Sequence, residues 1–255
     1  MNLIRSFFIA FSMYSKIPMP RTEWTRDAMK YSLCFFPLIG AVIGGIMLLW
    51  NWLAGEVPGR GSNLFTVVLV LIPVAVTGGI HLDGLLDTAD ALSSYKSMEE
   101  KLEILKDSHA GAFAIIVGIA YFLLSFGILS EAKTESIQIL AVGFVLSRAL
   151  SGLAVVSFPM AKNTGLAATF SDMAVKGRVR GVMVCYILLC AALMLWLDPV
   201  LGAAGFLGAG LDFWYYYRMS KKKFGGITGD LAGFFLQTCE LVMALCVIGV
   251  GLYRR

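Results

Sequence analysis

Seven apolar stretches, each long enough or nearly long enough to cross a lipid bilayer, constrain this chain more than any other feature of its sequence. A membrane-spanning helix needs about 20 predominantly apolar residues, because it must cross about 30 Å of hydrocarbon. In hydrocarbon every backbone N–H and C=O must be satisfied within the segment, so each stretch is predicted to be helical. The stretches cover residues 33–54, 64–80, 113–130, 137–158, 181–197, 199–217 and 231–252.

The composition excludes a water-soluble protein. Only 15% of the 255 residues are charged and 58% are hydrophobic, whereas a soluble domain carries about 25% charged residues. We therefore predict an all-α, polytopic helical membrane bundle of about seven transmembrane helices, forming a single membrane-embedded domain over residues 1–255. Residues 1–20 are predicted to form an N-terminal interfacial helix. The net charge of +4 indicates no nucleic-acid partner, and the bilayer is the expected partner.

The distribution of lysine and arginine predicts how the bundle is oriented. With the N-terminus in the cytoplasm, sixteen of the 21 basic residues fall in cytoplasmic segments and Arg148 falls within a span. Only Arg60, Lys133, Arg254 and Arg255 fall on the outer side. The positive-inside rule therefore predicts a multi-pass protein of the cell inner membrane with a cytoplasmic N-terminus.

Two short patterns predict how neighbouring spans pack. Gly40 and Gly44 form a small-xxx-small pair, which lets another helix approach closely. Asp198-Pro199 separates two adjacent spans, and because proline cannot continue a helix, we expect a tight hairpin turn there.

Three aspartates at the inner end of the second span carry the strongest functional signal. Asp83, Asp87 and Asp90 lie in GGIHLDGLLDTADAL, residues 78–92, and their spacing places them on one helix face. Carboxylates this close repel each other unless a cation lies between them, and carboxylate oxygens suit Mg²⁺ bridging to phosphates. The pattern predicts a Mg²⁺ site; the alternative is a solvated helix face. His81 is expected either to cap or pack the helix or to take a chemical role.

A second polar patch is expected to face the same inner surface. In EEKLEILKDSHAGAF, residues 99–113, Lys106, Asp107 and Ser108 come just before the third span. This segment is either a solvated amphipathic helix on the membrane or a direct participant in the site.

A third patch, GGITGD at residues 225–230, opens the last span. The N–H groups at a helix N-terminus bind anions, so Thr228, Gly229 and Asp230 are candidates for substrate contact. The alternative for Asp230 is a helix cap.

Two ionisable residues lie deep within predicted spans. Arg148 and Glu240 sit in apolar runs, where a charge costs about 2.5–3.5 kcal/mol and calls for a partner or a water-filled cavity. They are expected to form a structural pair with each other. In the functional alternative, Arg148 binds a phosphate group of the substrate.

These strings resemble a known family. GGIHLDGLLDTADAL, LEILKDSHAGAF and GGITGD, in this order, are similar to the adenosylcobinamide-GDP ribazoletransferases, the cobalamin (5′-phosphate) synthases. FSMYSKIPMP, YSLCFFPLIGAVIGG and FPMAKNTGLAATF match the same family, so the resemblance covers nearly the whole chain. It implies a Mg²⁺-dependent membrane enzyme that joins adenosylcobinamide-GDP to α-ribazole, or to its 5′-phosphate, and releases GMP. A homo-oligomer or an assembly with other corrinoid-pathway enzymes is compatible with it.

The resemblance and the site chemistry together assign expected roles to the polar residues. The metal ligands would be Asp83, Asp87 and Asp90. The catalytic residues would be His81, Asp90 and Asp107, with Asp90 or His81 as the base that accepts the hydroxyl proton. The substrate-binding residues would be Lys106, Ser108, Arg148, Thr228, Gly229, Asp230 and Glu240. The active site would face the cytoplasm.

Two other classes of protein compete with this interpretation. Another membrane transferase that handles diphosphates would also carry spaced aspartates, but the sequence lacks D-x-x-D-G-x-x-A-R and a second aspartate-rich motif. A cation or metabolite transporter would use buried charges such as Arg148 and Glu240. Transporters often contain inverted repeats and midplane sites, whereas here the acids cluster at one edge and no repeat is evident.

Overall fold

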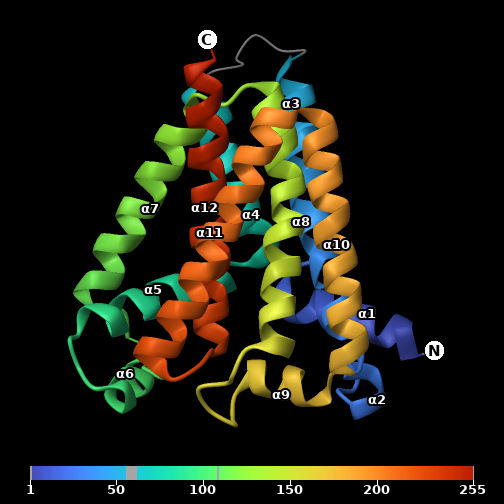
Figure 1. Ribbon diagram of the computed structural model, residues 1–255, viewed down its shortest axis with the longest axis vertical. Helices are drawn as coiled ribbons and strands as arrows, with labels where there is room; N and C mark the ends of the chain where they lie inside the picture. The colour runs from blue at the N-terminus through green and yellow to red at the C-terminus, as the bar shows by residue number, and fades with distance from the viewer. Residues whose placement is uncertain (1, 56–61, 108, 255) are drawn as a thin grey trace.

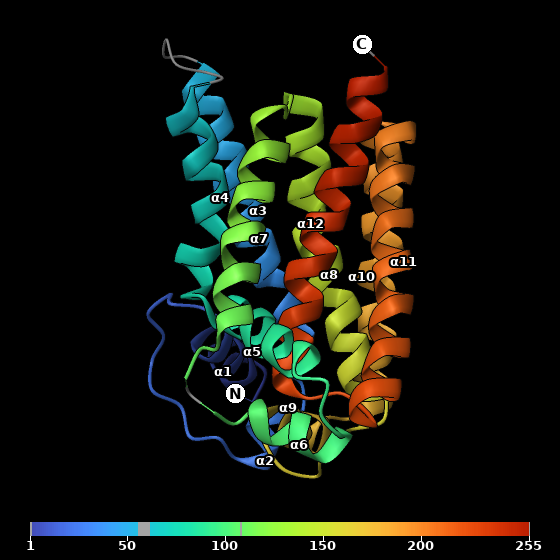
Figure 2. The same cartoon turned by 90° about the vertical axis from the view of Figure 1, so that its left-hand side faces the viewer.

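The computed structural model describes residues 2–55, 62–107 and 109–254, and helices dominate all three ranges. Arg60, Ser108 and Arg255 lie outside the described residues. Seven long helices run side by side, and each overlaps one of the predicted spans (Figures 1 and 2). They are α3 (Phe36–Gly55), α4 (Asn63–Thr77), α7 (Ala112–Ser130), α8 (Thr134–Ser157), α10 (Lys176–Leu197), α11 (Pro199–Phe224) and α12 (Gly229–Tyr253). The predicted all-α bundle is confirmed.

Five of the described segments are long and apolar enough to cross a membrane: α7, α8, α10, α12 and the segment Arg26–Gly55 that ends in α3. Helix α4 passes the same test only when it is taken together with the following helix, from which it is separated by a sharp bend. Helix α11 has 26 residues, but Asp212 and the polar-edged rings of Trp214–Tyr217 lower its mean hydropathy. The chain is thus a multi-pass membrane protein by helix length and composition, and the number seven stays a prediction.

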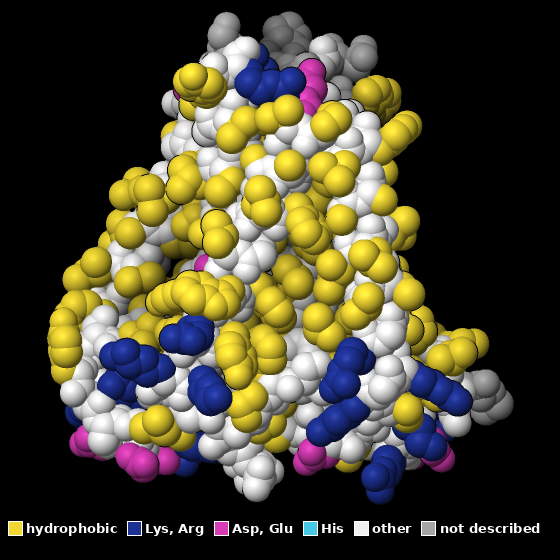
Figure 3. Space-filling model, viewed as in Figure 1, with side chains coloured by type: hydrophobic (Ala, Val, Ile, Leu, Met, Phe, Trp, Pro, Cys, Tyr) yellow, Lys and Arg dark blue, Asp and Glu magenta, His cyan; other side chains and the backbone are white. Residues whose placement is uncertain are grey.

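Shorter helices gather at one end of the bundle, which we call the short-helix end (Figure 1). The N-terminus lies at this end and the C-terminus at the opposite one. Lysine and arginine side chains concentrate there, below a largely hydrophobic flank (Figure 3). The helices are α1 (Asn2–Tyr14), α2 (Arg26–Met29), the 3₁₀-helix η1 (Ser32–Phe35), α5 (Ile80–Ser93), α6 (Met98–Ile104) and α9 (Leu166–Met173).

Helix α1 is the N-terminal helix that the sequence predicts. It buries Ile9, Ala10 and Phe11 against the bundle and leaves Leu3 and Ile4 exposed. Exposed apolar residues on a surface helix at the end of a membrane bundle suit an interfacial position.

Helix α8 forms the centre of the bundle, with 83% of its most apolar stretch buried, against 11% for the peripheral α7. Helix α3 packs closely along it. A β-carbon at Gly40 would collide with the backbone carbonyl of Phe144, and one at Gly44 with that of Ala141. The small-xxx-small pair therefore performs the predicted task of letting two backbones approach.

Replacing Gly40 with valine is expected to lower stability by about 1–3 kcal/mol, because overpacking forces the backbones of α3 and α8 apart. Gly45→Val is the matched control, since nothing lies within 4 Å of a β-carbon at Gly45. Thermal unfolding in detergent should show a lower midpoint for Gly40→Val alone. Equal midpoints for the two variants would contradict the close packing of α3 on α8.

Two breaks interrupt the helical path, and the first of them positions functional residues. Gly78 and Gly79 have φ values of +66° and +81°, a left-handed conformation that glycine adopts without strain. They end α4 at Thr77 and turn α5 by 95°, so that α5 runs across the short-helix end rather than through the bundle. At the opposite end, Asp198 caps α11 by accepting hydrogen bonds from two backbone N–H groups, and Pro199 begins the helix. The predicted hairpin turn is confirmed.

Candidate functional site at the short-helix end

Two cavities lie next to each other at the short-helix end. The first, which we call the aromatic cavity, has a volume of about 300 Å³ and is lined by Tyr14, Phe36, His81, Asp83, Ser151 and Asp230, among others. The second, which we call the lysine cavity, has a volume of about 370 Å³ and is lined by Lys106, Lys162, Thr164, Thr228, Gly229 and Asp230, among others. Both volumes fall within the range of about 300–1,000 Å³ for small-molecule sites.

The two cavities share one wall. Gly229 and Asp230, at the N-terminus of α12, line both cavities, as do Leu166 and Ala167 of α9. Helix α5 approaches this wall closely, because a β-carbon at Gly84 would lie 2.5 Å from the carbonyl oxygen of Asp230. Glycine at position 84 thus allows Asp83 and Asp230 to lie beside the same cavity.

The loop that carries GGITGD is held by a distant loop. The N–H of Ala161 donates to the carbonyl of Ile227 at 3.0 Å, and the N–H of Ile227 donates to the carbonyl of Pro159 at 2.9 Å. A β-carbon at Gly226 would lie 2.5 Å from the nitrogen of Ala161. This pairing brings Lys162 to the N-terminus of α12.

The lysine cavity has the chemistry of an anion site. The Nζ of Lys162 donates to the carbonyl of Leu102 at 3.0 Å, which holds the ammonium group near the wall. Lys106 lines the same cavity and pairs with Glu103 at 2.8 Å on the exposed surface. The N-terminus of α12 adds backbone N–H groups and the positive end of a helix dipole. A phosphate ester would be stabilised here by both kinds of positive charge.

The aspartates of α5 have separate environments. Asp83 is exposed and lines the aromatic cavity, and Asp87 is half-buried. The carboxylate of Asp90 accepts hydrogen bonds from the N–H of Gly111 at 2.6 Å and of Ala114 at 2.9 Å. Asp90 therefore caps the N-terminus of α7, and both of its oxygens are already engaged.

The electrostatics around Asp87 favour a cation. Helix α5 lies outside the spanning segments, and burial raises the pKa of Asp87 to about 6, with further contributions from Asp83, Asp230, Asp90 and Asp107. In the described part of the chain, neither Asp83 nor Asp87 forms an ion pair. A cation beside Asp87 would favour the ionised form of its carboxyl group.

The carboxylates suit a Mg²⁺ ion that is held partly by the protein and partly by the substrate. Among the described residues, no three His, Cys, Asp or Glu side chains converge closely enough to enclose an ion. Mg²⁺ often keeps several waters and binds one or two carboxylates together with substrate phosphates. Asp83 lines the aromatic cavity, Asp230 lines both cavities, and Asp87 lies one helical turn from Asp83. These carboxylates fit a Mg²⁺ ion that the substrate helps to hold.

His81 lies deep in the wall of the aromatic cavity. Its ring packs beside the neighbouring rings of Tyr14, at 6.2 Å between ring centroids, and Phe36, at 5.8 Å. The side chain is only 4% exposed, and its Nε2 has no hydrogen-bond partner in the described structure. Burial lowers the pKa of His81 well below its usual value, with a smaller contribution from the charge of Arg148. The imidazole is therefore neutral, and its Nε2 is available for a hydrogen bond with a ligand.

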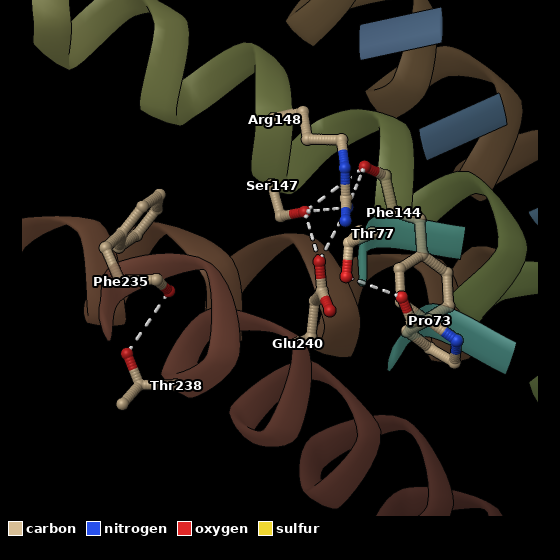
Figure 4. Close-up of polar contacts among 8 residues, drawn as sticks. All are labelled: Pro73, Thr77, Phe144, Ser147, Arg148, Phe235, Thr238 and Glu240. Carbon is tan, nitrogen blue, oxygen red and sulfur yellow. Dashed lines mark hydrogen bonds and ion pairs between the residues drawn. The ribbon is translucent and has the colours of Figure 1, made fainter. Parts of the chain in front are cut away.

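Arg148 and Glu240 lie in the interior of the bundle and line neither cavity. The Nη1 of Arg148 donates to Oε1 of Glu240 at 2.7 Å, and the same oxygen accepts from Ser147 at 3.0 Å (Figure 4). Arg148 is completely buried. Of the two alternatives for these residues, the structure contains the internal pair.

Among the remaining candidates, Asp107 accepts hydrogen bonds from the backbone and ring of His109 and is exposed. Ser108 lies outside the described residues. Thr228 caps α12 by accepting from the N–H of Leu231 at 3.2 Å. The site also contains Lys162, which is not among the residues predicted from the sequence, because a single loop lysine usually faces lipid headgroups or solvent. Only the pairing of its loop with residue 227 identifies it.

The fold and the site define a multi-pass helical membrane protein with a charged, ligand-sized double cavity at one end. The chain matches the cobalamin-5-phosphate synthase family model over residues 6–248 and belongs to that family. It is therefore a transferase of cobalamin biosynthesis.

Individual relatives agree over the full length. The chain is 50% identical to an adenosylcobinamide-GDP ribazoletransferase of Lachnoclostridium phytofermentans, covering 99% of this chain and 98% of the relative. It is 33% identical to a protein of the same name from Desulfitobacterium hafniense, covering 96% and 97% respectively. No solved structure matches the chain.

Proposed function

We propose that this chain is an adenosylcobinamide-GDP ribazoletransferase that uses Mg²⁺. The substrates are adenosylcobinamide-GDP and α-ribazole, or α-ribazole 5′-phosphate, and the products are adenosylcobalamin, or its 5′-phosphate, and GMP. One observation carries the proposal: the lysine cavity and the aromatic cavity share a wall that includes Gly229 and Asp230. Two substrates bound on either side of this wall would meet at the carboxylates.

The diphosphate of the activated corrinoid lies in the lysine cavity. Lys162 and Lys106 neutralise its charge, and the backbone N–H groups at Thr228 and Gly229 orient its oxygens. Asp83 and Asp87, with Asp230, would hold a Mg²⁺ ion. When bound, Mg²⁺ neutralises charge on the diphosphate oxygens and stabilises the departing GMP.

The reaction is an in-line substitution at phosphorus. The ribose hydroxyl of α-ribazole attacks the phosphorus nearer the corrinoid, a new P–O bond forms, and the P–O bond to the phosphate of GMP breaks. His81 is the proposed acceptor of the hydroxyl proton on grounds of access and not of basicity: its Nε2 has no partner among the described residues, whereas Asp90 already accepts two backbone hydrogen bonds.

Purified protein incubated with adenosylcobinamide-GDP, α-ribazole and Mg²⁺ is expected to form the cobalamin product and GMP in equal amounts. Chelation by EDTA should stop the reaction, and added Mg²⁺ should restore it. A transporter would release no GMP. Turnover that persists after chelation would contradict the metal assignment, and the absence of product from all incubations would contradict the proposed activity.

The short-helix end faces the cytoplasm of the cell in this proposal. Its concentration of lysine and arginine (Figure 3) supports this orientation through the positive-inside rule. In a variant without native cysteines, an impermeant thiol reagent applied to intact cells should label Lys133→Cys, at the opposite end, and should not label Asp172→Cys. The reverse pattern would overturn the orientation.

A further inference from the structure

We infer that the aromatic cavity binds the flat base of the nucleoside acceptor, and that Tyr14 and Phe36 determine which bases are accepted. The inference rests on the proposed function and adds to it the location of the second substrate. The base would be an apolar, fused aromatic ring such as the dimethylbenzimidazole of α-ribazole.

The walls of the cavity match such a ring. Tyr14 and Phe36 lie 4.5 Å apart between ring centroids and form an aromatic surface that extends to His81. Leu33 and Val155 continue the apolar lining. Aromatic faces of this kind bind nucleobases by stacking, and they favour flat rings over flexible groups of the same volume.

An unsatisfied polar group lies beside this surface. The Nε2 of His81 is buried without a partner in the described structure, although buried polar atoms nearly always have one. The ribose hydroxyl of a nucleoside bound here would supply the missing hydrogen bond. His81 thus provides evidence for a ligand that is independent of the shape of the cavity.

The chemistry of the two cavities decides which substrate occupies each. Guanine carries several donors and acceptors on its edges, and burying them unpaired among Tyr14, Phe36, Leu33 and Val155 would weaken binding. Dimethylbenzimidazole is apolar apart from one free ring nitrogen. The lysine cavity, with Lys106 and Lys162, suits the nucleotide end of the corrinoid substrate.

The location also suits the reaction geometry. Asp83 and Asp230 line the edge of the aromatic cavity, and Asp230 lines the lysine cavity as well. A base seated against Tyr14 therefore directs its ribose toward the shared wall, where the diphosphate is expected. Tyr14 and Phe36 act as specificity residues and take no part in proton transfer.

Steady-state kinetics with each substrate varied in turn tests the inference. Tyr14→Leu should raise the KM for α-ribazole about tenfold and leave the KM for adenosylcobinamide-GDP unchanged. Tyr14→Phe keeps the ring and should recover the KM for α-ribazole that Tyr14→Leu loses. Ser151→Leu, which places a larger side chain in the lining of the cavity, should also weaken the binding of α-ribazole. The matched control is Tyr95→Leu, because Tyr95 is 95% exposed and lines neither cavity.

Equilibrium dialysis with α-ribazole alone measures the same site without turnover, so it also reports on variants with low activity. Weaker binding by Tyr14→Leu and Ser151→Leu, with Tyr95→Leu unchanged, would support the inference. Unchanged KM and Kd for α-ribazole in both cavity variants, while the unaltered protein forms product, would overturn the inference and leave the proposed function intact. Absence of product from the unaltered protein would overturn the proposed function itself.

Discussion

Asp83→Asn is expected to lower kcat by about a hundredfold or more while leaving the fold intact. Asparagine has nearly the same shape as aspartate but no charge, so it cannot compensate the charge of Mg²⁺ or hold the ion against the diphosphate. Loss of a single preorganised electrostatic contact in an active site typically costs about 10²–10³ in rate. Asp83 is exposed and forms no ion pair among the described residues, so its replacement should not affect stability.

The matched control for Asp83→Asn is Asp172→Asn. Asp172 is an exposed aspartate of α9 at the same end of the protein, and it lines neither cavity. Release of GMP in single-turnover experiments across a Mg²⁺ titration should separate the two variants. Full turnover by Asp83→Asn at saturating Mg²⁺ would contradict the role assigned to Asp83, and equal losses in both variants would indicate a nonspecific effect of surface charge.

The comparison of sequence and structure is most informative at the aspartates. The i, i+4, i+7 spacing correctly places Asp83, Asp87 and Asp90 on one helix, because helical periodicity is a local property. It could not predict that Asp90 reaches the N-terminus of α7, since that contact depends on where Gly111 lies in the folded chain. The spacing therefore predicts which side of the helix the three aspartates occupy, but it does not identify the groups that each aspartate contacts.

The same distinction explains the other differences. The apolar stretches predict the seven long helices because burial in lipid requires length and hydrophobicity alone. The sharp turn between α4 and α5 depends on Gly78 and Gly79, which adopt a left-handed conformation. Hydropathy does not report backbone conformation, so the predicted second span continues past this turn to residue 80. Lys162 joins the site through a bridge between Met160 and Ile227, which are far apart in sequence.

Breaking the buried pair of Arg148 and Glu240 is expected to destabilise the protein by about 3–5 kcal/mol. Glu240→Met should be the more damaging single change, because a guanidinium group cannot lose its proton and would stay charged and unpaired in the interior. After Arg148→Met, the Glu240 carboxyl can take up a proton and become neutral. Thermal unfolding in detergent should therefore rank the unaltered protein first, Arg148→Met second and Glu240→Met last.

The double variant Arg148→Met/Glu240→Met distinguishes the cost of leaving one charge unpaired from a stabilising contribution of the pair itself. Removing both charges leaves neither one unpaired, so its stability should return close to that of the unaltered protein. Lys30→Met is the control, since it removes an exposed ion pair with Asp27 that should contribute less than about 1 kcal/mol.

Because Arg148 and Glu240 line neither cavity, the folded double variant should also keep its kcat and both KM values. A stable double variant with a raised KM for adenosylcobinamide-GDP would show instead that Arg148 contacts the substrate phosphate. A double variant as unstable as Glu240→Met would show that the pair contributes shape and hydrogen bonding, through Ser147 and the carbonyl of Phe144, that two methionines cannot replace.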